Sequence, residues 1–174
     1  MADGDSPHLD IRRFQRGDGE RVRELNELAM ATTPEYVPEA PDEDLDAVHH
    51  HYLEDEGEFI VGIVDDTIVA TGAFTPPNEW KEAYVNLDSD TTELTRMRVD
   101  PQCHGQGFGS AIYDELEQRA QSDGYQRFIL DTGTENDVAR AFYESLGFEC
   151  RREVPVDFGD LTIELALYEK FIDE

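Results

Sequence analysis

Lysine, cysteine and long apolar runs are all scarce in this sequence. Among its 174 residues the only lysines are Lys81 and Lys170, and the only cysteines are Cys103 and Cys150. Two cysteines are too few for a disulfide scaffold, so we expect two free thiols in a reducing compartment. No run of 18 apolar residues is present, which argues against a membrane span. The acidic first ten residues do not resemble a signal peptide. We therefore expect a cytoplasmic protein with no membrane partner.

Positive charge is also rare. The chain has 14 basic residues against 41 acidic ones, a formal net charge of −27. Such a charge repels itself in dilute buffer, but at molar salt the screening length falls to about 3 Å. The composition therefore predicts a halophilic protein from a salt-loaded cytoplasm. An acidic partner-binding surface and an unusually acidic low-salt protein are the alternatives. Because no basic stripe is available to meet phosphates, we expect no nucleic-acid partner.

Hydrophobic periodicity predicts one α/β domain over residues 1–174. A strand–helix–strand unit lies within an otherwise antiparallel set of strands, which indicates a mixed sheet with flanking helices. The region 76–90 is expected to be an irregular loop. The expected strands are 8–14, 58–66, 67–76, 91–101, 126–134 and two more after residue 148; the expected helices are 17–32, 43–54, 107–124 and 136–148.

The sequence also predicts two helix caps, the apolar stripe of the first helix and one hairpin turn. Asp18 is placed to cap the first helix and Asn136 to cap the last one. Leu28 falls on the apolar stripe of the first helix at helical spacing. A tight turn at Asp65 and Asp66 is expected to join two strands into a hairpin.

The segment from Val99 to Ser110 carries the clearest chemical signal. A strand runs into three alternate glycines, Gly105, Gly107 and Gly109, and then directly into a helix. Glycine leaves backbone N–H groups uncovered, and a helix start adds unpaired donors and partial positive charge. Together they predict a phosphate cradle; a glycine-rich turn used only for packing is the alternative. The spacing matches neither a P-loop nor a dinucleotide fingerprint, which argues against a kinase or a dehydrogenase.

The wider pattern resembles the GNAT superfamily of N-acetyltransferases. The family's phosphate loop, Arg/Gln-x-x-Gly-x-Gly/Ala, is matched by His104-x-x-Gly107-x-Gly109, and a second family segment is matched by residues 136–148. The resemblance covers about residues 91–148 and is only topological elsewhere. It implies a GNAT-like fold whose central strands splay apart. His104 replaces the usual Arg or Gln, so either its side chain or only its backbone N–H serves the loop.

The resemblance implies acetyl-CoA as cosubstrate, bound without a metal between the strands at 91–100 and 126–132. The pantetheine arm would pair with the backbone of the first of these strands, and loop amides would hold the pyrophosphate. Asn136 would approach the pantetheine arm or only cap its helix, and Arg140 would reach a CoA phosphate or only face solvent. The implied cofactor-binding residues are Met97, Arg98, Val99, His104, Gly105, Gln106, Gly107, Phe108, Gly109, Ser110, Asn136 and Arg140.

The implied reaction is direct attack of a primary amine on the thioester carbonyl. Tyr143 matches the family's proton donor to the leaving thiolate; its alternative role is a core aromatic. Glu93 lies where some members carry the base, although water chains or other residues serve in many. A backbone N–H near Met97 or Arg98 would polarise the thioester oxygen.

The acceptor would be a small amine or a protein amine, and the oligomeric state is left open, with a homodimer as one option because members of the family often dimerise. A non-catalytic acyl-CoA sensor with the same fold is the alternative function. Tyr143 and the intact glycine loop argue against that alternative.

Three other clusters give weaker signals. Consecutive histidines at 49–51 point in different directions on a helix, so we expect no metal site there. Cys103 lies beside the glycine loop, but no paired base is evident for a covalent role. The acidic run is expected to be a solvated face, the alternative being attraction of a cationic amine; its members are Asp42, Glu43, Asp44 and Asp46.

Overall fold

A seven-stranded mixed sheet forms the centre of the computed structural model, which describes residues 7–34, 36, 42–54 and 56–172. Neighbouring strands are antiparallel except for the parallel pair β4–β5. This confirms the predicted mixed sheet. In spatial order the strands are β1 (Asp10–Arg13), β2 (Glu58–Val64), β3 (Thr67–Thr75), β4 (Thr91–Val99), β5 (Arg127–Gly133), β7 (Leu161–Phe171) and β6 (Glu149–Phe158).

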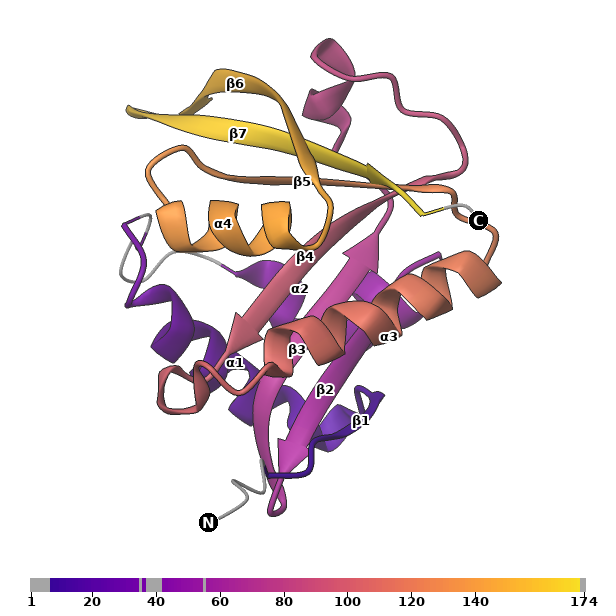
Figure 1. Cartoon of the computed structure of the whole chain (residues 1–174), viewed down its shortest axis with the longest axis vertical. Coiled ribbons are helices and arrows are strands. Elements are labelled where there is room, and N and C mark those ends of the chain that lie inside the picture. The colour runs from indigo at the N-terminus through magenta and orange to yellow at the C-terminus, as the bar shows by residue number, and fades with distance from the viewer. Residues whose placement is uncertain (1–6, 35, 37–41, 55, 173–174) are drawn as a thin grey trace.

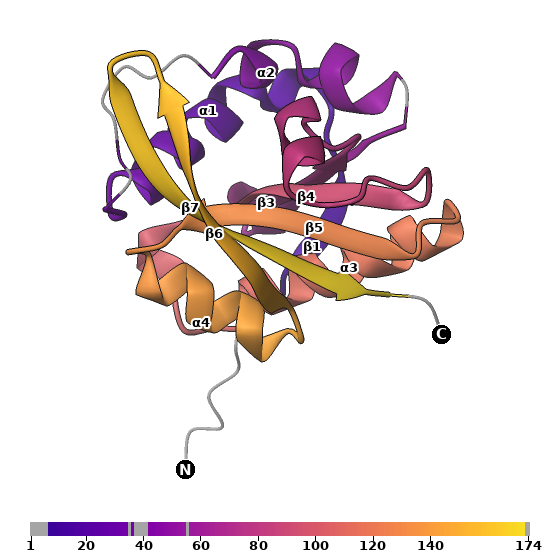
Figure 2. The same cartoon turned by 90° about the horizontal axis from the view of Figure 1, so that it is seen from above.

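Helices cover both faces of the sheet (Figure 2). One face carries α1 (Gly19–Met30) and α2 (Glu43–Asp46), and the other carries α3 (Phe108–Ser122) and α4 (Asp137–Ser145). Each face has its own apolar core, with Leu25 of α1 in one and Leu116 of α3 in the other. Within the described ranges, none of the helices has the length and apolar character needed to cross a membrane.

The predicted turns and one predicted cap are confirmed. Asp65 and Asp66 both adopt positive φ, 48° and 65°, between β2 and β3, as a tight two-residue hairpin turn requires. The Asn136 side chain accepts a hydrogen bond from the Ala139 N–H at 3.1 Å and so caps α4. The chain leaves α4 through Gly147 at φ 97°.

Two predictions about α1 are wrong. Asp18 does occupy the N-cap position, but its side chain makes no capping bond to the helix; its carboxylate instead accepts from the Arg12 guanidinium at 2.7 Å and from the Gln15 N–H at 2.8 Å. Leu28 is 42% exposed. Asn26 is buried instead, and its amide oxygen accepts bonds from Arg96 and Arg98 of β4.

The predicted helix over 43–54 is interrupted. Helix α2 ends at Asp46, Ala47 adopts the non-helical φ of −143°, and a π-helical turn follows over His49–Leu53. Residues 76–90, predicted to be irregular, contain a short 3₁₀ helix, η3 (Glu79–Ala83). Both departures matter for the site, because α2 and η3 each contribute a charged side chain to the neighbourhood of β4.

The central strands β4 and β5 pair only over their first residues. Thr91–Glu93 aligns with Arg127–Ile129, and from there the two strands diverge while β5 stays paired with β7 (Figure 1). Strand β4 also bulges against β3, with Arg96 at φ 55° and its carbonyl accepting from the Thr71 hydroxyl at 2.8 Å. The predicted splay is therefore present, and it leaves one edge of β4 open toward β5.

Candidate functional site

A cleft of about 930 Å³ opens where β4 and β5 separate. Its walls come from β4, the end of β5, the loop before α3, the start of α4 and the end of α1. It brings together most of the predicted site residues: Glu93, Met97, Arg98, Val99, His104, Gly105, Gly107, Phe108, Gly109, Ser110, Asn136 and Tyr143.

The loop before α3 has an open backbone. Gly105 and Gly107 adopt φ of 81° and 79°, and a Cβ at either position would meet no protein atom within 4 Å. Gly107 is the N-cap of α3 and provides no side-chain cap. Within the described residues, the N–H groups of 104–110 donate to no protein oxygen, while Ala111 is the first to bond back, to Gly107. The loop therefore offers a row of donors at a helix N-terminus, which suits a phosphate.

Gly109 has a packing role instead. A Cβ at this position would lie 3.2 Å from the ring of Phe142 on α4, so that ring would have to shift by a few tenths of an ångström. The two interpretations of the glycine loop thus apply to different glycines: open donors at Gly105 and Gly107, close packing at Gly109.

Two predicted cofactor residues do not line the cleft. Gln106 is exposed. The Arg140 guanidinium donates to the Tyr168 hydroxyl at 2.9 Å, to the Thr134 carbonyl at 3.0 Å and to Glu153 at 2.9 Å. These bonds hold Arg140 at the junction of β5, α4 and the β6–β7 hairpin, so the structure supports neither a phosphate contact nor a purely solvent-exposed side chain.

Tyr143 lies on α4 and borders the cleft. Its ring is half-buried and packs against Phe142 and Phe148, with centroid distances of 5.3 and 5.8 Å. Asn136 also borders the cleft while it caps α4. Tyr143 thus packs as a core aromatic and Asn136 caps its helix, and both side chains still lie beside the cleft.

Glu93 is buried at the fork of the sheet beside an unforeseen lysine. The Lys81 ammonium, supplied by η3, donates to the carboxylates of both Glu93 and Asp131. Burial raises the pKa of Glu93, as does the nearby Asp131 charge, and the Lys81 charge opposes them. Both carboxylates border the cleft. Only the rarity of lysine in the sequence pointed to Lys81.

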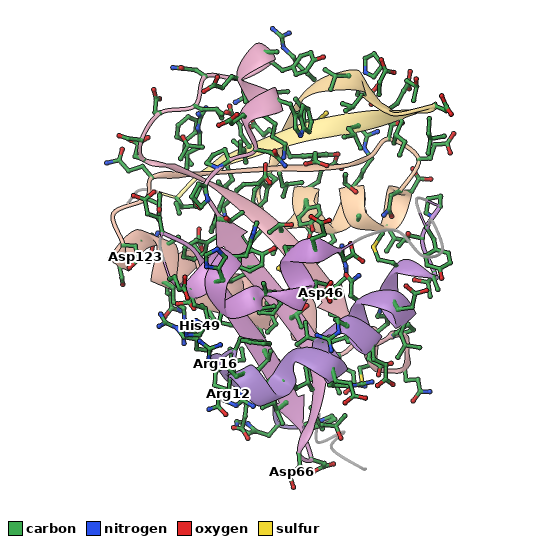
Figure 3. All side chains as sticks on the ribbon, turned by 180° about the vertical axis from the view of Figure 1, so that it is seen from behind. Arg12, Arg16, Asp46, His49, Asp66 and Asp123 are labelled. Atoms are coloured by element: carbon green, nitrogen blue, oxygen red, sulfur yellow. The ribbon has the colours of Figure 1, made fainter. Side chains whose placement is uncertain are left out.

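The acidic run is not a uniformly solvated face, which corrects the prediction. The Arg96 guanidinium donates to Asp44 at 2.6 Å and to Asp42 at 3.1 Å. Burial by itself would raise the pKa of Asp44, but the bonds and charge of Arg96 hold it below its usual value. The ion pairs fix α2 against β4 at the wall of the cleft. Glu43 and Asp46 do face solvent, and Figure 3 shows Asp46 on this outer side.

Replacing Asp44 with Asn is expected to cost about 3 kcal/mol of stability, because it leaves the partly buried Arg96 charge without its main partner. Since the folded-state pKa of Asp44 is lowered, its contribution is present above the unfolded pKa and is lost as pH falls through the folded value. Urea unfolding at pH 7 and near pH 3 measures the loss of stability and its dependence on pH. Asp46→Asn is the control, because Asp46 is 70% exposed and lies 3.9 Å from Arg23. Equal losses in the two variants would contradict the prediction.

The weaker clusters have structural partners. His49 lies beside Arg16 at 3.2 Å (Figure 3), and His50 bonds Glu54 at 2.7 Å. Across the ranges described, no group of three or more potential metal ligands occurs. Burial raises the pKa of the Cys103 thiol, and Asp100 adds to this, so the reactive thiolate form is disfavoured.

The comparisons with known proteins decide the family. The acetyltransferase (GNAT) family profile matches residues 22–148. The chain belongs to this family. It is 29% identical over 123 residues to human N-acetyltransferase 8, covering 70% of this chain but 52% of that protein. It is 27% identical over 146 residues to N-alpha-acetyltransferase RimI of Mycobacterium tuberculosis, covering 83% of this chain and 81% of that one. The chain thus spans about half of the human relative.

Solved structures share the GNAT fold. An N-acetyltransferase from Staphylococcus aureus superposes with a TM-score of 0.77 at 20% identity, covering 95% of this chain and 99% of that one. The yncA protein of Salmonella typhimurium, solved with its cofactor acetyl-CoA, superposes with a TM-score of 0.75 at 19% identity, covering 95% of each chain. The fold of this GNAT chain is therefore one on which an acetyl-CoA complex has been solved.

Proposed function

We propose that this GNAT protein transfers the acetyl group of acetyl-CoA to a primary amine. The observation that carries the proposal is the row of backbone N–H groups at 104–110, which bond to no oxygen of the described residues and, Gln106 apart, line the cleft. The names of the relatives as N-acetyltransferases support it. A small molecule or a protein amine would serve as acceptor.

The cofactor would lie along β4. Its pyrophosphate would accept hydrogen bonds from the loop before α3, aided by the partial positive charge of that helix start. The pantetheine arm would pair with the open β4 edge near Met97 to Val99, as an added strand does at an exposed sheet edge. Main-chain groups carry both interactions, which suits a chain with few cations to offer.

The chemistry would proceed in one displacement. The neutral amine attacks the thioester carbonyl carbon, a C–N bond forms, the C–S bond breaks and CoA leaves as a thiolate. An N–H near Met97 or Arg98 would stabilise the developing oxyanion. Tyr143 would give its proton to sulfur, and Glu93 would take the proton that the amine loses. A raised pKa suits Glu93 to that role, because it moves the carboxyl closer to working pH.

The direct test is release of CoA from acetyl-CoA at high salt with a panel of small amines and N-terminal peptides. Turnover with at least one amine is expected. Tight CoA binding with no turnover on any acceptor would instead favour the non-catalytic sensor. Weak CoA binding together with no turnover would contradict both functions.

Gly107→Ala is expected to weaken acetyl-CoA binding by about tenfold. At φ 79° an alanine costs about 1 kcal/mol in backbone strain, and the reoriented N–H would no longer face the phosphate. Gly124→Ala is the matched control, because Gly124 has φ 91°, also has no atom within 4 Å of a new Cβ, and lies at the far end of α3. Isothermal titration and thermal melts separate the two effects. Equal loss of affinity in both variants would mean that backbone strain, not loss of a phosphate contact in the loop, explains the result for Gly107→Ala.

A further inference from the structure

Lys81 is a buried ammonium at the point where the sheet divides. Its side chain is only 1% exposed, and it contacts one carboxylate from each of the diverging strands, Glu93 of β4 and Asp131 of β5. Glu93 belongs to the last residue pair that joins β4 to β5, opposite Ile129. Lys81 therefore links the two strands directly at the apex of the cleft.

Burying a lysine in this position is energetically unfavourable. The chain keeps only two lysines among 174 residues, and burying an ammonium is unfavourable unless it is paired. Here the two carboxylates compensate, and the pKa of Lys81 is raised above its usual value despite burial. The ammonium thus stays charged, and the cluster of three groups carries one net negative charge when both carboxylates are ionised.

Without that ammonium the two carboxylates would oppose each other. Burial and the Asp131 charge both favour the protonated form of Glu93, while the Lys81 charge and hydrogen bond, with a smaller contribution from a backbone hydrogen bond at Asn78, favour its ionised form. A protonated Glu93 has no capacity to accept a proton from the acceptor amine. The remaining lysine, Lys170, has a different setting: it pairs with Glu117 at 3.2 Å over the ring of Tyr113.

We propose that Lys81 is a positioning residue of the acetyltransferase, which holds Glu93 and Asp131 together across the fork and keeps Glu93 available as the base. The inference rests on the proposed function for its catalytic meaning. Its physical content, control of the Glu93 carboxyl by Lys81, stands apart from any turnover.

The test compares Lys81→Met with Lys170→Met and the unaltered protein. Methionine keeps similar length and apolar volume but removes the charge. Carboxyl ¹³C resonances of Glu93 are titrated by NMR at constant high salt. The titration midpoint of Glu93 is expected to rise by about one pH unit or more in Lys81→Met, a tenfold change in the proton equilibrium, and to stay unchanged in Lys170→Met. A midpoint that does not move in folded Lys81→Met overturns the proposal.

Kinetics supply the catalytic readout. The acidic limb of the kcat/KM profile is expected to move to higher pH by the same amount in Lys81→Met and to stay in place in Lys170→Met. A merely structural lysine would lower the melting temperature without moving the limb, and that result would overturn the positioning role. If no amine is acetylated even by the unaltered protein, the proposed function fails while the NMR titration still decides on Lys81.

A second variant covers the case in which Lys81→Met does not fold. Lys81→Met combined with Asp131→Asn removes both the ammonium and the opposing charge, so the repulsion disappears. Its Glu93 midpoint is expected to stay above that of the unaltered protein, because burial is then no longer opposed by Lys81. A midpoint at or below the unaltered value would overturn the proposal.

Discussion

Tyr143→Phe is expected to lower kcat about a hundredfold, the size of a typical general acid–base contribution, and to leave the Kd of acetyl-CoA within about twofold. The substitution removes only the hydroxyl oxygen. The ring contacts with Phe142 and Phe148 remain, so the α4 wall of the cleft keeps its shape. Single-turnover kinetics with a reactive amine and a separate binding titration measure the two quantities.

The matched control is Tyr125→Phe. The Tyr125 hydroxyl donates to the Glu56 carbonyl at 3.0 Å, and Tyr125 lies outside the cleft. Loss of the Tyr125 hydroxyl is expected to lower the free energy of unfolding without lowering kcat. An unchanged kcat in Tyr143→Phe would remove Tyr143 from the acid role and leave protonation of the thiolate to water. Equal drops in kcat and CoA affinity would assign Tyr143 to binding.

Local pattern was enough to predict the order of the strands and main helices and the open backbone of the glycine loop. Strand and helix periodicities repeat over short windows, and the special backbone of Gly107 and of the Asp65–Asp66 turn depends on residues next to it. The open N–H row at 104–110 is a property of one continuous segment. For the same reason the Asn136 cap was predictable, since its partner Ala139 is three residues away.

The unpredicted features depend on partners distant in sequence. Lys81 meets Asp131 across 50 residues, and Arg96 meets Asp44 across 52. The high acidic content favoured reading the run at 42–46 as solvated, but composition carries no information about which carboxylates lie next to an arginine. Arg140 bonds Tyr168, a residue of β7 that lies 28 positions further along the chain, so this contact could not be predicted from the sequence around Arg140. Charged pairs that join separate elements are thus the features that only the fold reveals.

Thermal stability is expected to rise steeply with salt. The net charge of −27 is spread over 9979 Å², about one charge per 370 Å², which corresponds to a mean spacing of about 19 Å. The screening length is about 30 Å at 0.01 M salt, longer than this spacing, and about 3 Å at 1 M, far shorter. Repulsion therefore acts between many charges in dilute buffer and between almost none at molar salt. We expect the melting temperature to rise by about 10 °C or more over this range.

Sucrose is the control for this experiment, because it favours burial of the protein surface without screening charge. KCl is expected to stabilise most strongly between 0.01 and 0.5 M, where the screening length changes most, and sucrose is expected to show no such steep region. A melting temperature independent of KCl would contradict the halophilic interpretation.

The same net negative charge predicts an unusual salt dependence for cofactor binding: the affinity should rise with salt concentration. Anionic ligands held by cationic side chains bind more weakly as salt rises, since screening removes the attraction. Arg96 and Arg98 both line this cleft: Arg96 is paired with Asp42 and Asp44, and Arg98 donates to the Asn26 and Met97 oxygens, while the loop at 104–110 offers uncharged N–H groups. An anionic cofactor would thus meet net repulsion from the protein, and screening would relieve it. Acetyl-CoA is expected to bind more tightly at 1 M than at 0.1 M KCl, provided the protein is folded at both. The opposite trend would indicate a cationic phosphate contact.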